Sequence, residues 1–219
     1  MARSALHTTY PAGVQWRCHR DSGAKQRRDV DTMTAMMERN TATAKTPGAP
    51  TVQERTARKR ATRYLLGGLR LALGWIFLWA FLDKLFGLGF ATEAKSAWIN
   101  GGSPTKGFLT FGATGPFQGF YNSIAGAAWA DWLFMIGLAA IGTALMLGIG
   151  VRVAAAAGGL LLVLMWTAAL LPANNPFMDD HLIYAGVLAL LAVTNAGDTW
   201  GLGRTWARLP IVQRFGWLR

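Results

Sequence analysis

After residue 63 the chain contains long windows without a single charged side chain, and this feature constrains the fold more than any other. A soluble domain of this size alternates apolar and polar faces, whereas a helix in lipid is apolar on every side. Residues 1–63 contain no comparable run and little to bury. The sequence therefore predicts an all-α integral membrane protein with a disordered leader over residues 1–62.

Four windows predict transmembrane helices, and they give a four-transmembrane-helix bundle over residues 63–200. They are Tyr64–Phe86, Trp132–Ile149, Val153–Leu171 and Leu182–Ala196. The fourth has only 15 residues, about 22 Å of helix against a hydrocarbon core of about 30 Å. Its helix is therefore expected to continue past one or both ends.

The connection between the first two windows is long, and its second part, residues 107–130, has no charge but contains five Gly and one Pro. A fifth span here is an alternative. Glycine, proline and several phenylalanines favour instead an element that lies in the membrane interface. An odd number of spans would also separate the basic leader from the basic tail.

The basic residues predict the orientation. The net charge is +11, and 13 of the 22 Lys and Arg lie in residues 1–63, with four more after Gly197. Basic segments stay in the cytoplasm, so both termini, including the tail at 201–219, are predicted to be cytoplasmic and the long first loop exterior. A nucleic-acid-binding arm is the alternative, but no basic motif with interleaved aromatics accompanies the charge, so no nucleic-acid partner is expected.

Small residues recur every fourth position in the later windows, which in lipid lets helices approach closely. The positions are Ala140, Ala144 and Gly148 in the second window, Ala154 and Gly158 in the third, and Ala185 and Ala189 in the fourth.

Cysteine and histidine are too few for several kinds of redox centre. Cys18 is the single cysteine, which excludes an internal disulfide and a thiolate iron–sulfur cluster. His181 is the single histidine outside the leader, so bis-histidine haem is excluded too. We expect no haem, iron–sulfur cluster or metal site.

Several strings of the membrane region resemble the DoxX family of small membrane proteins. They are RLALGWIFLWAFLDKLF, GPFQGFY, DWLFMIGLAAIGTALMLGIGVRVAA and NNPFMDDHLIYAGVLALLAVTNAGDTWGLGRTW, and the resemblance covers about residues 63–206. The family includes the DoxD-type membrane subunit of thiosulfate:quinone oxidoreductase. The resemblance implies a multi-pass protein of a prokaryotic plasma membrane, with a protein partner subunit and a quinone as cofactor.

The first helix carries three ionisable residues. Arg70 and Lys84 share one helix face, near its inner and outer ends. They could simply extend to the nearest interface. Alternatively, Lys84 faces the bundle and donates to a quinone carbonyl or an anion, with Asp83 as its counter-ion.

A second polar cluster precedes and begins the fourth helix. It consists of Asn174, Asn175, Asp179, Asp180, His181 and Tyr184. Asp179 could cap the helix and Asp180 complement its dipole, which needs no ligand. His181 is not explained in this way, and histidine titrates in the range useful for quinol protons. The predicted topology places this cluster on the same outer side as Lys84.

Together these residues predict one quinone site at the outer leaflet. We assign the reaction to His181, Lys84 and Asp180, and quinone binding to Arg70, Asp83, Asn175, Asp179 and Tyr184. The predicted function is a membrane subunit of a quinone-linked oxidoreductase. The main alternative is a non-catalytic anchor or accessory subunit of a respiratory or oxidative-stress complex. A small transporter is disfavoured because the spans show no inverted repeat.

Overall fold

The computed structural model describes residues 21–43, 51–172, 175 and 177–219. The chain divides into two compact units, Met1–Thr51 and Val52–Arg219. All regular structure in the described residues is helical. The helices are α1 (Asp21–Thr43), α2 (Val52–Phe86), η1 (Ala94–Ser96), η2 (Trp98–Asn100), η3 (Phe108–Gly112), η4 (Gly115–Phe117), α3 (Gln118–Ile124), α4 (Ala128–Leu147), α5 (Val151–Ala168), α6 (Asp180–Val193), η5 (Ala196–Asp198), α7 (Gly203–Trp206), α8 (Pro210–Arg214) and η6 (Gly216–Leu218).

Part of the leader is helical where the sequence predicted disorder over residues 1–62. Helix α1 occupies residues 21–43, and α2 begins at Val52, well before the apolar window. Each α1 residue from Lys25 to Arg39 is exposed, so this part of α1 buries no face. Its helical conformation is favoured by residues of good helix propensity, such as Ala, Met, Arg and Glu. The disorder expected for residues 1–20 and 44–50 lies outside the described residues.

Among the described residues, three helices are long and apolar enough to cross a membrane: α2, α4 and α5. Only 28 to 39% of their apolar windows is buried inside the protein. Large side chains such as Leu133, Ile136 and Leu160 are 58 to 68% exposed. A surface of this kind suits lipid rather than water as the solvent. The protein is therefore all-helical, and three of its helices have the character of membrane spans.

The fourth apolar helix, α6, has 14 residues, about 21 Å at 1.5 Å per residue. It gains two residues at its start relative to the predicted window but ends at Val193, earlier than predicted. Thr194 turns its hydroxyl back onto the Leu190 carbonyl at 2.7 Å. Asn195 then adopts left-handed backbone angles (φ 49°), which ends the helix. The helix thus extends past the start of the predicted window, one of the two expected ends, and a tight turn ends it on the other side.

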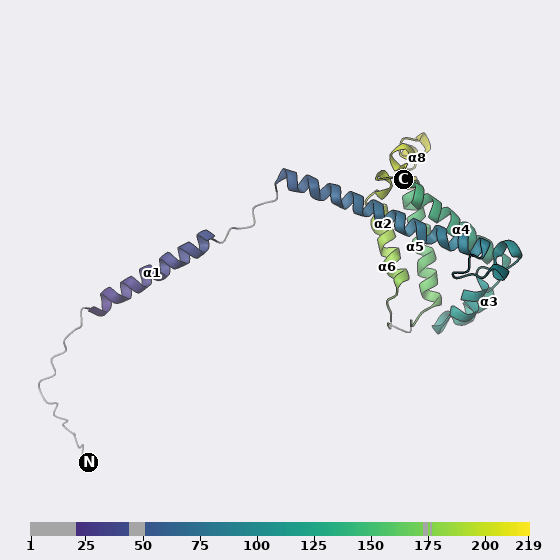
Figure 1. The fold of residues 1–219 in the computed structure, drawn as a ribbon, viewed down its shortest axis with the longest axis horizontal. Helices are drawn as coiled ribbons and strands as arrows, with labels where there is room; N and C mark the ends of the chain where they lie inside the picture. Colours follow the sequence, from purple (N-terminus) through teal and green to yellow (C-terminus); the bar gives the residue numbers. More distant parts are fainter. Residues whose placement is uncertain (1–20, 44–50, 173–174, 176) are drawn as a thin grey trace, which may run out of the picture. The chain divides into compact units, whose positions relative to one another are not determined.

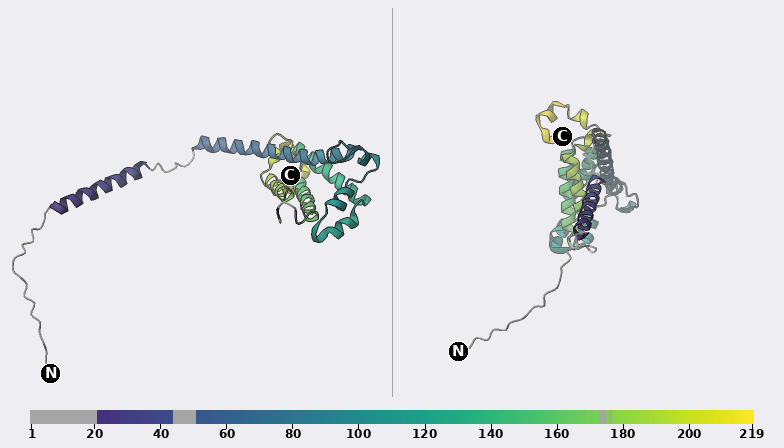
Figure 2. Two further views of the ribbon diagram at one scale, coloured as in Figure 1. Left: turned by 60° about the horizontal axis from the view of Figure 1, so that its bottom comes forward. Right: turned by 90° about the vertical axis from the view of Figure 1, so that its left-hand side faces the viewer.

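The second unit is built from two helix pairs. Helix α2 runs beside α4, and α5 runs beside α6, with α4 and α5 in contact between the pairs (Figure 1). The turned views in Figure 2 show α5 and α6 alongside each other. A shared core of Leu73, Phe77, Leu145, Leu188 and Leu191 joins the pairs. The apolar part of α2 and α5 both begin at one end of this bundle, where α4 and α6 end. We call it the basic end, after Arg63, Arg152, Arg204 and Arg219, and the opposite one the loop end.

Small residues do pack between the helices, but not all at the predicted positions. Gly158 lies against Leu188 and Phe77, as expected for a close contact. Ala140, in contrast, is exposed, and Gly142 takes its place: a Cβ there would lie 2.7 Å from the Leu78 backbone nitrogen. The geometry of the helix crossing determines which small residue lies at the contact between two helices, and a four-residue repeat in the sequence does not specify that position.

The long first loop forms no spanning helix in the described residues, as the interface interpretation predicted. Its second part is broken into η3, η4 and α3. Tyr121 of α3 is buried, and its hydroxyl lies 2.5 Å from Thr167 Oγ1 and 3.1 Å from the Leu164 carbonyl of α5. The Thr114 amide donates to the Ala168 carbonyl at 2.8 Å. The loop is therefore fixed to the end of α5.

Candidate functional site

A groove of about 480 Å³ runs along the last turns of α2 at the loop end. Its α2 side consists of two stripes at a spacing of four residues, Trp75–Trp79–Asp83 and Ile76–Ala80–Lys84. Phe90 and Ala91 from the following loop form the other side. This volume lies within the range of small-molecule sites in proteins, which are mostly apolar with a few polar groups.

The loop folds back over α2 because of two residues. Gly87 has a positive φ of 66° and lies so close to Glu93 and Ala94 that a Cβ would meet Ala94 Cα at 2.6 Å. Asp83 is 2% exposed, and its carboxylate accepts hydrogen bonds from the amides of Phe90 (3.3 Å) and Ala91 (3.0 Å). Asp83 therefore positions one wall of the groove, and these two amides already occupy its oxygens.

The groove walls are aromatic. The Trp79 ring packs edge-on against Phe90 at 5.2 Å between centroids, and the Trp75 ring is 5.6 Å from Trp79. Trp75 and Phe90 are 49% and 76% exposed, so the groove opens on the outer surface of the helix pair. A flat, apolar ring system could lie against such walls.

Lys84 is the single basic group of the groove. Its side chain is half-buried, and among the described residues it has neither a hydrogen-bond nor an ion-pair partner. The predicted counter-ion Asp83 lines the same groove and acts on Lys84 through its charge, but the two side chains form no direct ion pair. The ammonium group is thus free to donate to a carbonyl or anionic oxygen of a ligand.

The polar cluster at the start of α6 confirms the capping interpretation. Asp179 is the N-cap residue, and its Oδ1 accepts from the Leu182 amide at 3.3 Å. Its Oδ2 lies 2.7 Å from His181 Nδ1, while Asp180 Oδ1 is 3.5 Å from the same nitrogen. His181 is therefore held between two carboxylates, as predicted from its neighbours.

Other members of this cluster have local partners or lie elsewhere. Asn175 Oδ1 accepts from the amides of Phe177 and Met178, each at 3.0 Å. Tyr184 is half-buried and packs against the bundle core. Asn174 lies outside the described residues. Single ligand atoms of Asp179, Asp180 and His181 lie within 4.8 Å of one another, an arrangement that could also hold a cation.

The structure does not bring the two halves of the predicted site into contact. The described partners of His181 are Asp179 and Asp180, whereas Lys84 lines the groove with residues 75–91. Figure 1 shows the end of α2 and the beginning of α6 at different places of the loop end. A shared site of Lys84, His181 and Asp180 remains a prediction without a contact to support it, so we treat the groove and the α6 cluster separately.

Arg70 binds the protein backbone rather than a lipid interface. It is fully buried, and one terminal nitrogen donates to the carbonyls of Leu145 and Met146 (3.1 Å), at the end of α4. The other donates to Thr199 (3.1 Å) and Trp200 (3.0 Å), after α6. These contacts leave Nε as the one guanidinium nitrogen without a partner among the described residues. The sequence left two roles open for Arg70: extension of its side chain to the nearest membrane interface, or quinone binding. The four carbonyl contacts exclude the first role.

Sequence reasoning overlooked Asp131 in the first turn of α4. It is 7% exposed, and one carboxylate oxygen accepts from Ser103 (2.9 Å), from the Thr105 hydroxyl (2.5 Å) and from the Thr105 amide (3.1 Å). It fixes the first loop to α4. The sequence feature that could have pointed to Asp131 is an acidic residue in the first turn of an otherwise apolar helix.

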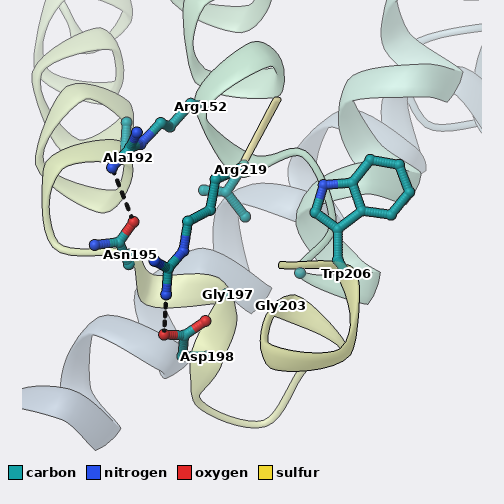
Figure 3. Close-up of a pocket in the computed structure, with 10 residues that line it drawn as sticks. Arg152, Ala192, Asn195, Gly197, Asp198, Gly203, Trp206 and Arg219 are labelled. Carbon is teal, nitrogen blue, oxygen red and sulfur yellow. Dashed lines mark hydrogen bonds and ion pairs between the residues drawn. The ribbon is translucent and has the colours of Figure 1, made fainter. Parts of the chain in front are cut away.

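The basic end is closed by the C-terminal segment. Arg152 donates to Asn195 Oδ1 at 3.2 Å, and Arg219 forms an ion pair with Asp198 at 3.0 Å (Figure 3). The cavity between these side chains measures only about 10 Å³, about the minimum for one water molecule. These contacts are therefore packing contacts, and the groove of α2 is the better candidate for a ligand.

Fold and groove define a class: an all-helical protein with helices suited to a membrane and an aromatic groove that contains one lysine. Comparison of the chain with known protein families, with characterised proteins and with solved structures found no match. The functional conclusion therefore depends on the geometry and on the resemblance of the sequence strings given above.

Proposed function

We propose that this chain is the membrane subunit of a quinone-linked oxidoreductase, similar to thiosulfate:quinone oxidoreductase, and that it binds the quinone in the α2 groove. The observation that carries the proposal is a half-buried lysine at the end of an aromatic groove of about 480 Å³, whose ammonium group donates to no oxygen among the described residues. A quinone head group is flat, apolar and edged by carbonyl oxygens. Such a group matches the walls and the single donor.

Each residue of the groove has a separate role in the proposed quinone binding. Trp75, Trp79 and Phe90 hold the ring, Lys84 donates to one carbonyl oxygen, and Asp83 keeps Phe90 in place. A bound quinone would accept two electrons from a partner protein and take up two protons. His181, between its two carboxylates, is the chain's candidate for passing protons at the loop end.

Removing the Lys84 ammonium should weaken quinone binding. A charge-assisted hydrogen bond contributes about 1.5–3 kcal/mol, so Lys84→Met should lower the affinity by about tenfold or more. We would measure concentration-dependent labelling by a photoreactive azidoquinone in lipid nanodiscs, with mass spectrometry of the labelled peptide. Lys106→Met is the control, because Lys106 is exposed and lies outside the groove. Equal labelling of both variants and wild type would contradict the proposal.

The alternative is a non-catalytic anchor for a partner enzyme. It is favoured by the first loop, which is fixed to α5 yet exposes Phe111, Phe117 and Phe120 by 85, 49 and 62%. An anchor should lose its partner when these phenylalanines are replaced by serine and keep it in Lys84→Met. A quinone subunit should lose turnover in Lys84→Met while the complex stays assembled. Purification in mild detergent, followed by identification of what co-purifies, distinguishes the two.

We further propose four membrane crossings, with both termini in the cytoplasm of a prokaryotic cell. Single cysteines in a Cys18→Ser background test this with a membrane-impermeant maleimide on intact cells. Ser96→Cys in the first loop should be labelled, and Gln213→Cys in the tail only after lysis, since both side chains are exposed. Labelling of Gln213→Cys in intact cells would contradict four crossings, and also the packing of the tail beside the start of α5, where the Arg152 amide donates to the Arg219 carbonyl.

A further inference from the structure

A second cavity, of about 280 Å³, lies at the basic end between α2 and the turn after α6. Its polar lining consists of Arg63, Arg204, Thr194, Thr199, Asn195 and Asp198. It differs from the groove in having two guanidinium groups, hydroxyl groups and no aromatic wall. Nothing in the proposed quinone chemistry uses it.

The cavity carries an excess of positive charge. Among the described residues, neither Arg63 nor Arg204 has an ion-pair or hydrogen-bond partner for its side chain. The one acid of the lining, Asp198, is already paired with Arg219 at 3.0 Å, as Figure 3 shows. The two lining arginines are therefore left without a compensating carboxylate.

Buried Arg70 stabilises one wall of this cavity. Arg63 and Arg70 are seven residues apart, which places them on nearly the same face of α2 and about 10 Å apart along its axis. Between them, Gly67 packs against Thr199: a Cβ there would lie 3.1 Å from Thr199 Cγ2. Arg70 holds the Thr199 carbonyl from behind, and its side chain contacts no carboxylate among the described residues. It thus adds a further positive charge near a fixed wall.

We propose that this cavity binds a phosphate group, supplied by the head group of an anionic phospholipid. Guanidinium groups bind phosphate oxygens in a bidentate manner. The Thr199 hydroxyl and the Asn195 amide group are the further donors of the lining, since the Thr194 hydroxyl already donates to the Leu190 carbonyl. Arg63 directly precedes Tyr64, the first residue of the apolar window of α2. In a spanning helix this position lies at head-group depth, where basic pockets between helices bind anionic lipids. The site is independent of the α2 groove and of quinone.

The test compares two double variants that remove the same charge. All four arginines are exposed, but Arg63→Gln with Arg204→Gln removes charge from the cavity lining, whereas Arg60→Gln with Arg208→Gln removes the same charge from the same segments outside it. The full chain in detergent is titrated with short-chain phosphatidylglycerol, short-chain phosphatidylcholine and inorganic phosphate, and binding is followed by calorimetry. The cavity variant should bind phosphatidylglycerol about tenfold more weakly or worse. The matched variant should stay within about twofold of wild type.

Each other outcome counts against the proposal. Equal losses in the two variants would mean that diffuse surface charge attracts the lipid. An unchanged affinity in the cavity variant would exclude the site. Inorganic phosphate that binds the wild type as tightly as phosphatidylglycerol would overturn the lipid as the source of the phosphate group. Competition titrations on the wild type give this last answer even where a variant folds poorly.

Discussion

Arg70→Met should destabilise the bundle by about 3–5 kcal/mol, because each buried carbonyl oxygen left without a donor costs about 1–3 kcal/mol. The methionine can fill part of the space but donates no hydrogen bond. Four carbonyl oxygens, of Leu145, Met146, Thr199 and Trp200, would lose a donor in the interior. Removing the buried charge recovers some desolvation energy, so the loss is smaller than the sum of four broken bonds. The readout is unfolding in mixed micelles, followed by circular dichroism.

Two further variants make the Arg70 result specific. Arg204→Met removes an arginine that is exposed, so it should change the free energy of unfolding by less than about 0.5 kcal/mol. Arg70→Lys keeps the charge but replaces a fork of donors by one ammonium group, which cannot reach both pairs of carbonyls in the same geometry. It should fall between wild type and Arg70→Met. An Arg70→Met protein as stable as the wild type would show that the four carbonyls find other donors.

Arg70 also shows what the sequence could and could not predict. Its helix, its helix face and its depth near the inner end follow from local periodicity, and the structure agrees with the helix. Its acceptors lie 75 to 130 residues away in the chain. Backbone carbonyls exist at every residue, so no pattern of side chains marks which four of them will surround a guanidinium group. That choice depends on how α2, α4 and the turn after α6 meet.

Only the α2 side of the groove could be predicted, again because local spacing does not show which distant residues it contacts. Lys84 and Asp83 were recognisable as charges in an apolar window, and the stripe of Trp75 and Trp79 follows from their spacing of four. Phe90 joins them because Gly87 reverses the chain and Asp83 binds the two amides of the loop. The sequence suggested that Asp83 was a counter-ion. In the structure the charge of Asp83 acts on Lys84, and its carboxylate also accepts hydrogen bonds from two backbone amides, which the sequence did not indicate.

In the α6 cluster, the contacts between chain neighbours were predictable, whereas the pairing with a distant residue was not. Asp179, Asp180 and His181 are neighbours in the chain, so their mutual contacts and the helix cap were predictable from local geometry alone. The step that needed tertiary information was the pairing of His181 with Lys84. Placing two residues on the same side of a membrane fixes their depth but leaves their lateral positions open. Helix pairing, α2 with α4 and α5 with α6, determines those positions.

Gly142→Ala should destabilise the bundle by about 2–3 kcal/mol because it separates α2 from α4. A Cβ at this position would lie 2.7 Å from the Leu78 nitrogen and 2.9 Å from its Cα. These are backbone atoms of the neighbouring helix, so no side-chain rotation relieves the contact. The helices must move apart, which also loosens the nearby contact of Gly74 with Leu145 and Met146.

Gly137→Ala on the same helix is the matched control. No atom lies within 4 Å of a Cβ built there, and alanine has the higher helix propensity, by about 1 kcal/mol in water. This variant should therefore be as stable as the wild type or slightly more so. The opposite signs of the two substitutions separate packing from propensity, since both replace glycine by alanine in α4. If both variants unfold at the same detergent concentration, α2 and α4 do not pack as closely as the structure has them.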